Sequence, residues 1–195
     1  PVGGGGLISG MSIYLKKKYP NSKIIGVESE DAPTLYTSMK NGKPTTLNQV
    51  GLFVDGCAVK RIGNETFKIS SKYVDDVVLV SIDETCAAIK DIYEDTRIMS
   101  EPAGALSVAG MKKFILENDI KNKNILVVNS GANLNFDRLR HVTERAEVGE
   151  GKELLLSVNI PEIAGSFRSF CEVIGKRSIS EFNYRYASEK TANVF

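Results

Sequence analysis

The stretch Pro1-Val-Gly-Gly-Gly-Gly-Leu7 decides how the rest of the sequence is interpreted. Glycine permits positive φ and a close approach of the backbone to a ligand, so successive N–H groups can converge on one anion. Residues 7–19 follow with apolar side chains at helical spacing, which predicts an amphipathic helix: Leu7, Ile8, Met11, Tyr14 and Leu15. Because the first N–H groups of a helix add further donors, the combination indicates a phosphate-binding loop.

Two other interpretations of the glycine run fit the sequence less well. A flexible linker mixes in serine and is seldom followed at once by an amphipathic helix, as it is here. A nucleotide-binding P-loop requires Lys-Ser or Lys-Thr after its last glycine, and neither follows Gly6. The run imitates the dinucleotide motif G-x-G-x-x-G only loosely. The local pattern therefore indicates a phosphate site but leaves the phosphate ligand open.

Beyond the glycine run, the pattern alternates between apolar strands and amphipathic helices. Short apolar runs predict three buried strands at residues 23–28, 77–80 and 125–128. Helices are predicted at 7–19, 34–39, 83–96, from Pro102 onward and at 135–146, with a loop-rich stretch at 51–63. Ser81-x-x-Glu84 has the form of a capping box. This order is typical of an α/β fold with a parallel sheet.

A polar, glycine-bearing segment at residues 149–152 separates this part from one with a different pattern. Residues 154–160 alternate as a half-buried strand does, and a helix is expected at 165–175. A strand at 179–187 places Phe182, Tyr184 and Tyr186 on one face, and residues 191–195 begin another. The order β-α-β-β is the opening of an α+β ferredoxin-like unit. We expect a first domain at 1–148, a linker at 149–152 and a second domain at 153–195.

Composition excludes several classes of protein. The chain has 195 residues, 42% of them hydrophobic, and 25 basic against 24 acidic side chains. This balance predicts no affinity for nucleic acid or for a membrane surface. The cysteines Cys57, Cys86 and Cys171 match no zinc or redox motif, and we expect buried, reduced thiols in a cytoplasmic or, in a eukaryote, organellar compartment. His141 is expected to be structural or on the surface.

Two further side chains are candidates for a site. Ser130 follows the predicted strand 125–128, at the end of a parallel strand where ligands bind, but a serine in a turn can equally cap a helix. Glu101 lies at a predicted helix start, where a carboxylate also favours the helix dipole. From local pattern alone, the dipole interpretation is the stronger one for Glu101.

Four segments together resemble one family. They are the glycine run, Gly51-Leu-Phe-Val-Asp-Gly-Cys-Ala-Val-Lys-Arg-Ile-Gly63, Ser100-Glu-Pro-Ala-Gly-Ala105 and Ser130-Gly-Ala-Asn133. In this order they resemble the C-terminal half of the catalytic domain of biosynthetic threonine dehydratases, which are fold-type II (tryptophan-synthase-β-like) pyridoxal-phosphate enzymes. Residues 160–185 resemble the start of the ACT-like regulatory domain of that family.

The resemblance implies pyridoxal 5′-phosphate (PLP) as cofactor and assigns roles to the candidate residues. Gly3, Gly4, Gly5 and Gly6, with the amide of Leu7, would hold the phosphate. Ser130 would hydrogen-bond the pyridine nitrogen, and Glu101 would lie near the ring. A serine hydroxyl protonates the ring less than a carboxylic acid does, which favours loss of a β-hydroxyl group over transamination. The implied reaction removes the α-proton and water from L-threonine and releases 2-oxobutanoate and ammonia.

The sequence also departs from the family pattern. The Schiff-base lysine belongs to a Ser-Phe-Lys motif that has no match here, so no catalytic residue is assigned in this chain. Because the chain begins at Pro1 inside a motif, we expect a part of a longer protein that is inactive alone. The related racemases bind a metal through two carboxylates. Glu28 and Ala32 fit that pattern, but Thr34 stands where the second carboxylate would be, so we predict no metal.

The resemblance implies partners as well, and it leaves alternatives. L-threonine would be the substrate, with L-serine as an alternative, in the first committed step of isoleucine biosynthesis. Isoleucine and valine would be effectors of a homotetramer in which regulatory domains from adjacent chains touch. A serine/threonine dehydratase or serine racemase of the same family is the nearest alternative. A non-catalytic regulator that binds phosphate or an amino acid is an alternative of another class.

Overall fold

The computed structural model of the chain describes residues 1–188 and 191–194. The chain forms two compact units, Pro1–Lys152 and Glu153–Phe195, and each is described by itself. In the described residues no helix combines the length and apolar character needed to cross a membrane.

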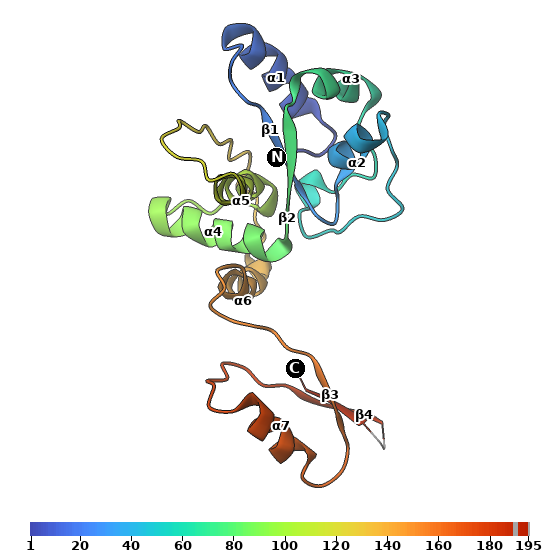
Figure 1. The fold of residues 1–195 in the computed structure, drawn as a ribbon, viewed down its shortest axis with the longest axis vertical. Coiled ribbons are helices and arrows are strands. Elements are labelled where there is room, and N and C mark those ends of the chain that lie inside the picture. Colours follow the sequence, from blue (N-terminus) through green and yellow to red (C-terminus); the bar gives the residue numbers. More distant parts are fainter. Residues whose placement is uncertain (189–190, 195) are drawn as a thin grey trace. The chain divides into compact units, whose positions relative to one another are not determined.

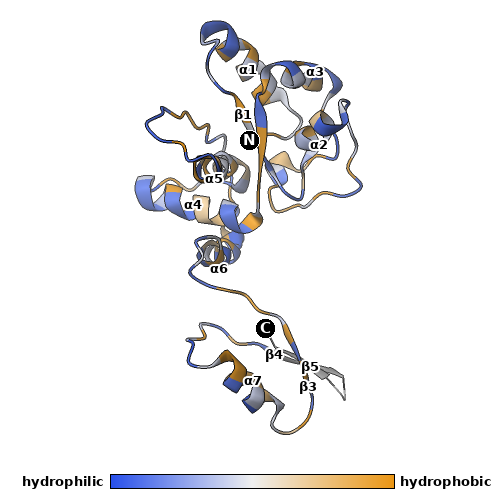
Figure 2. Ribbon diagram, viewed as in Figure 1, coloured by the Kyte–Doolittle hydropathy of each residue, from blue (hydrophilic) through white to orange (hydrophobic). Residues whose placement is uncertain are grey.

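Two parallel strands lie at the centre of the first unit (Figure 1). β1 (Ile25–Ser29) pairs with β2 (Asp76–Val80) over their whole length, from Ile25 opposite Asp76 to Ser29 opposite Val80. The apolar residues of β2 appear orange in Figure 2, and three of its five side chains are buried. The predicted strands at 23–28 and 77–80 are therefore confirmed, each shifted by one or two residues.

Three helices pack around the N-terminal half of this unit. α1 (Gly6–Lys18) contacts α3 (Asn64–Tyr73), while α2 (Thr34–Asn41) contacts α3 and both strands. The helices at 7–19 and 34–39 were predicted, whereas α3 was not. Its ten residues bury only Phe67 and Ser70, too few apolar positions to produce a helical stripe in the sequence.

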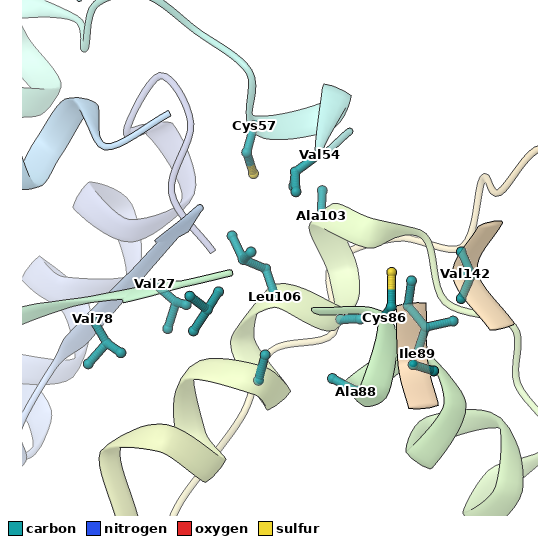
Figure 3. Close-up of a cluster of buried hydrophobic side chains, with 14 residues drawn as sticks. Val27, Val54, Cys57, Val78, Cys86, Ala88, Ile89, Ala103, Leu106 and Val142 are labelled. Atoms are coloured by element: carbon teal, nitrogen blue, oxygen red, sulfur yellow. The ribbon is translucent and has the colours of Figure 1, made fainter. Parts of the chain in front are cut away.

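The other half of the unit is a helical layer with a shared hydrophobic core. α4 (Ile82–Thr96) contacts both α5 (Pro102–Glu117) and α6 (Leu139–Gly149), and α5 also contacts β1 and β2. Figure 3 shows Leu106 of α5 between Val27 and Val78 of the strands and Ile89 of α4. The capping box of α4 is confirmed, because Glu84 N–H donates to Ser81 Oγ at 3.1 Å and Ser81 N–H donates to Glu84 Oε2 at 2.7 Å.

The strand predicted at 125–128 is wrong. The segment is irregular, and Ile125 and Leu126 are 44% and 80% exposed. A strand requires a neighbouring strand to satisfy its backbone, and within the described residues β1 and β2 pair only with each other. The segment instead follows α5, where Ser107 Oγ donates to the carbonyl of Val128 at 2.7 Å. The helix predicted at 135–146 begins later, as a 3-10 turn η2 (Phe136–Arg138) followed by α6.

The second unit has the order β-α-β-β. β3 (Val158–Pro161), α7 (Ser166–Ile174), β4 (Tyr184–Ser188) and β5 (Thr191–Val194) form a sheet in the order β3-β5-β4, with both pairings antiparallel. This is the strand arrangement expected of a ferredoxin-like opening. Phe195 and the side chain of Tyr186 lie outside the described residues.

The core of the second unit is small. Ile160 is its buried residue, and the ring of Phe167 lies 6.2 Å from that of Phe170 and 5.1 Å from that of Phe182. β3 begins at Val158, later than the strand predicted at 154–160. The residues before it are not packed, since Leu154 and Leu155 are 78% and 72% exposed. Cys171 on α7 is also exposed, so the expectation of three buried cysteines holds only for Cys57 and Cys86.

Candidate functional site

One cavity of about 280 Å³ in the first unit brings the predicted site residues together. Gly3, Gly4, Gly5, Gly6 and Leu7 line it together with Glu101 and Ser130. The remaining lining residues are Pro1, Val2, Ile8, Gly56, Cys57 and Ala103. Three segments that lie far apart in the sequence thus meet at one place.

The glycine loop (residues 1–7) is fixed at both ends. At its start, Val2 N–H donates to the carbonyl of Val27 in β1 at 2.9 Å. At its end, Gly5 is the N-cap of α1 and has φ 87°, a left-handed conformation that favours glycine. A Cβ at Gly5 would lie 2.9 Å from Ile62 Cδ1 and from Thr66 Cβ. The loop therefore requires glycine here for both its conformation and its contacts.

The amide groups of the loop are available to a ligand. Among the described residues, no backbone or side-chain acceptor receives the N–H groups of Gly3, Gly4, Gly5, Gly6 or Leu7. The N-terminus of α1 has neither a side-chain cap nor an acidic residue in its first turn. A Cβ on Gly4 or Gly6 would meet nothing within 4 Å, so the loop is open there. Five free donors at a helix N-terminus favour an anion.

The orientation of these amides follows from the bonds of the neighbouring carbonyls. The Gly4 carbonyl accepts Thr66 Oγ1–H at 2.7 Å and Gly63 N–H at 3.4 Å, both from the side of α3. Because a trans peptide directs its C=O and N–H oppositely, the Gly5 N–H points away from α3. Thr66 and Gly63 hold the loop on the side that faces α3. Sequence reasoning missed both residues because it missed α3.

The Glu101 carboxylate lies between two glycines. Its Oε2 accepts the N–H of Asn133 at 3.2 Å, and the Glu101 N–H donates to the carbonyl of Gly131 at 3.1 Å. A Cβ would lie 2.1 Å from Glu101 Oε1 if added to Gly131, and 3.6 Å if added to Gly56. Glu101 is the N-cap of α5 but makes no side-chain cap bond. Its carboxylate is thus directed to the turn at 130–133 and the cavity.

The Ser130 hydroxyl makes no hydrogen bond to any described residue, and the residue is exposed at the cavity. The alternative role as a helix cap does not apply, because the N-cap of the next helical turn, η2, is Asn135. The hydroxyl is therefore free to donate to a ligand.

Cys57 is a lining residue that sequence reasoning missed. Its Cα lies 3.1 Å from the position of a Cβ on Gly3, so the loop and Cys57 are in close contact. The residue is 6% exposed, and burial raises the pKa of the Cys57 thiol. The thiol is neutral at physiological pH and acts as a small apolar wall.

Glu28 is the carboxylate that fits the metal pattern of the racemases, and its oxygens already accept hydrogen bonds from the protein. Its Oε1 accepts Thr34 Oγ1–H at 2.9 Å and Leu35 N–H at 2.8 Å, and its Oε2 accepts Tyr36 N–H at 2.9 Å. Burial raises the pKa of the Glu28 carboxyl, while these donors act against the increase. Among the described residues, no group of three or more His, Cys, Asp or Glu side chains is placed to hold a metal ion.

The fold is shared with a solved threonine deaminase. The processed form of threonine deaminase isoform 2 from Solanum lycopersicum superimposes with a TM-score of 0.74 and 43% identity, over 75% of this chain and 43% of that one. The family described as "Pyridoxal-phosphate dependent enzyme" matches residues 1–131. The chain belongs to this family of pyridoxal-phosphate-dependent enzymes.

The relatives make the comparison more specific. "C-terminal regulatory domain of Threonine dehydratase" describes the family that matches residues 144–195. The L-threonine dehydratase biosynthetic IlvA of Pasteurella multocida is 54% identical over 195 residues, and the mitochondrial threonine dehydratase of Schizosaccharomyces pombe is 53% identical over 196. Both alignments cover the whole of this chain. The chain spans 38% and 33% of the length of these two relatives.

The cofactor of this family fits the cavity. PLP carries a phosphate group and a pyridine nitrogen, and the cavity offers free amides for an anion and a free hydroxyl for a ring acceptor. No lysine is among the residues that line the cavity in the described part of the chain.

Proposed function

We propose that this chain is the phosphate- and ring-binding part of a threonine ammonia-lyase, joined to the start of its regulatory domain. The observation that carries the proposal is the convergence of Gly3–Leu7, Glu101 and Ser130 on one cavity whose amides have no acceptor in the described protein. The names of the relatives support the choice of L-threonine as substrate, since those from Pasteurella multocida and Schizosaccharomyces pombe, both matched over the whole chain, are threonine dehydratases.

Each residue of the cavity then has a role in holding the cofactor. The amides of Gly3, Gly4, Gly5, Gly6 and Leu7 bind the phosphate through charge-assisted hydrogen bonds, reinforced by the positive end of the α1 dipole. Ser130 would donate its hydroxyl hydrogen to the pyridine nitrogen. Glu101, whose carboxylate accepts the Asn133 N–H, would lie near the ring. When bound, PLP supplies the electron sink that allows a proton to leave the substrate Cα.

The chain's own contribution to the chemistry is orientation and electrostatic tuning. Because Ser130 is a neutral donor, it does not place a full proton on the ring nitrogen, and this favours elimination of the β-hydroxyl over transamination. No residue of this chain is proposed as the covalent anchor or as the base that removes the α-proton. L-threonine is converted to 2-oxobutanoate and ammonia, the first committed step of isoleucine biosynthesis.

The second unit is proposed to receive allosteric effectors. Its β-α-β-β order and the match of residues 144–195 to a regulatory domain support this role. We propose isoleucine and valine as effectors and a homotetramer as the assembly. The compartment follows the organism: the cytoplasm in a bacterium, an organelle in a eukaryote, as the mitochondrial relative suggests.

A chimeric enzyme tests the proposal directly. This chain replaces the 195 aligned residues of the Pasteurella multocida relative, so that every other part of an active enzyme is supplied. We expect the chimera to take up PLP, absorb visible light and release 2-oxobutanoate from L-threonine. The chain alone is expected to release none. A chimera that releases no 2-oxobutanoate from L-threonine but converts L-serine to D-serine favours the racemase alternative, and one that takes up no PLP favours a non-catalytic regulator.

The role of Ser130 is tested in the same chimera with a matched control. Ser130→Ala removes the proposed donor to the ring nitrogen, and a lost hydrogen bond in a binding site lowers kcat by about tenfold or more. Ser71→Ala removes a hydroxyl of the exposed surface of α3, which donates to the carbonyl of Lys68, and should leave kcat unchanged. Equal kcat values for both variants would show that the Ser130 hydroxyl does not contribute to the site.

A further inference from the structure

Two segments face each other across Glu101 at the cavity. The loop wall, Phe53–Cys57, contributes Gly56 and Cys57, and the turn wall, Ser130–Asn133, contributes Ser130. Both approach Glu101 through a glycine, since added Cβ atoms on Gly56 and Gly131 would lie 3.6 and 2.1 Å from Glu101 Oε1. The position of the Glu101 carboxylate therefore depends on both walls.

Arg138 connects these two walls. It ends η2, five residues beyond the turn wall, and its guanidinium reaches back to the loop wall. Nη1–H donates to the carbonyl of Phe53 at 3.1 Å, and Nη2 lies 3.6 Å from Asp55 Oδ2. Within the described residues, no backbone N–H donates to the Phe53 carbonyl. The guanidinium is thus the partner that satisfies this part of the loop.

The other attachment of the loop wall is apolar and lies on its inner side. Val54 is 1% exposed, and Figure 3 shows Val54 and Cys57 directed toward Ala103 and Leu106 of α5. This packing fixes the depth of the loop, but apolar contacts are not directional. The Arg138 guanidinium fork adds direction through its hydrogen bond to the Phe53 carbonyl, while its other nitrogen lies at ion-pair distance, 3.6 Å, from Asp55 Oδ2.

We propose that Arg138 is a positioning residue for the cofactor site. This inference rests on the proposed function. By holding the loop wall to the segment that carries Ser130, it sets the width of the cleft and keeps Glu101 between its two glycines. It touches neither cofactor nor substrate. Its side chain is 34% exposed, so its loss should alter the site more than the stability of the fold.

Arg138→Gln in the chimeric enzyme tests the inference. The glutamine retains polarity but loses the charge and the fork. We expect the dissociation constant of PLP to rise about five- to tenfold and kcat to fall by a similar factor, with the Tm of the cofactor-free protein within about 1 °C of the parent. Arg138→Lys keeps the charge but not the planar guanidinium, and its affinity for PLP should lie between those of the parent and Arg138→Gln.

Two further variants separate positioning from a general loss of charge. Arg61→Gln removes an exposed guanidinium that bonds Asn64 and should leave PLP affinity unchanged. Asp55→Asn should lower PLP affinity in the parent, yet add nothing in the Arg138→Gln background, because the two side chains act as one pair.

The outcomes are distinct. Parental PLP affinity and kcat in Arg138→Gln would overturn the inference, and so would a loss that only accompanies a lower Tm of the cofactor-free protein. An unmodified chimera that takes up no PLP would overturn the proposed function itself, before Arg138 is considered.

Discussion

The N-termini of α1 and α4 are the same element used in opposite ways. At α4, Ser81 and Glu84 satisfy each other's backbone N–H groups, and Asp83 and Glu84 supply negative charge in the first turn. At α1, Gly5 stands in the N-cap position, Leu7 and Ile8 follow in the first turn, and the amides of the glycine loop have no acceptor among the described residues. The difference shows that a helix N-terminus becomes a candidate anion site when its own side chains leave it unsatisfied.

A third helix shows an intermediate solution. The N-terminus of α2 has no side-chain cap of its own, but the buried carboxylate of Glu28, from β1, accepts the N–H groups of Leu35 and Tyr36. The protein itself therefore supplies the acceptor for these α2 amides. α1 is the one of these three helices whose first amides have no acceptor among the described residues, and this comparison can be tested.

The largest effect is expected where the glycine loop turns into α1. Gly5→Ala places a side chain at φ 87° and brings its Cβ within 2.9 Å of Ile62 and Thr66. We expect a loss of about 2 kcal/mol or more in the free energy of unfolding of the chimeric enzyme, with loss of PLP uptake. Urea denaturation followed by circular dichroism measures the first, and visible absorbance the second.

Gly42→Ala is the matched control for that change. Gly42 also has positive φ, at 66°, but an added Cβ meets nothing within 4 Å and the residue lies away from the cavity. Its replacement should cost about 1 kcal/mol and leave PLP uptake intact. If Gly42→Ala abolished uptake as well, strain rather than the loop would explain the result.

A smaller effect on stability alone is expected at α4. Ser81→Ala removes the hydroxyl that accepts the Glu84 N–H, and the loss of such a cap costs about 1 kcal/mol. PLP affinity should not change, because this N-terminus is closed by side chains in the parent. Urea denaturation with a PLP titration checks both statements, and a weaker PLP affinity in Ser81→Ala would contradict the distinction between α1 and α4.

The carboxylate at α2 should give stability a pH dependence. Burial raises the pKa of Glu28, so the folded state binds the proton more readily than the unfolded state does. The resulting stabilisation is complete below the unfolded pKa of about 4.3 and is lost as pH rises through the folded pKa. Urea denaturation at a series of pH values measures the difference in the free energy of unfolding between the parent and Glu28→Gln, and this difference should show the decline. Glu65→Gln, at an exposed ion pair, should keep it.

The smallest effect is expected from inorganic phosphate. At a concentration equal to its dissociation constant, phosphate should stabilise the cofactor-free chimera by about 0.4 kcal/mol. Ser81→Ala should retain this increment, whereas Gly4→Ala should lose it, because the new Cβ enters the open side of the loop. Thermal denaturation in phosphate, against chloride of equal ionic strength, provides the measurement. An increment that persists in Gly4→Ala would place the anion elsewhere.

The order of several short segments in the sequence, taken together, was enough to identify most of the candidate site. Local pattern alone indicated a phosphate loop at Gly3–Leu7, whereas Glu101 and Ser130 became site candidates through the family resemblance, and all of them line one cavity. The capping box at Ser81 was equally predictable, because its two partners are three residues apart. Their assigned roles toward a cofactor remain predictions.

The features that were missed depend on distant contacts. α3 packs against α1, and its Thr66 hydroxyl donates to the carbonyl of Gly4 in the glycine loop, 62 positions away. Arg138 and Phe53 are 85 positions apart, and nothing in either segment indicates the other. The strand predicted at 125–128 shows the reverse error. Its apolar run resembles a strand, but pairing depends on a neighbour that a local pattern cannot supply.

The strand order of the second unit has a consequence for the timing of its folding during synthesis. β5 lies between β3 and β4, and both of its neighbours pair with it rather than with each other. On a ribosome, which releases the chain from its N-terminus, residues 158–188 would emerge with two strands that have no partner. The sheet can assemble only after residues 191–194 leave the exit tunnel, so until then β3 and β4 both have unpaired edges.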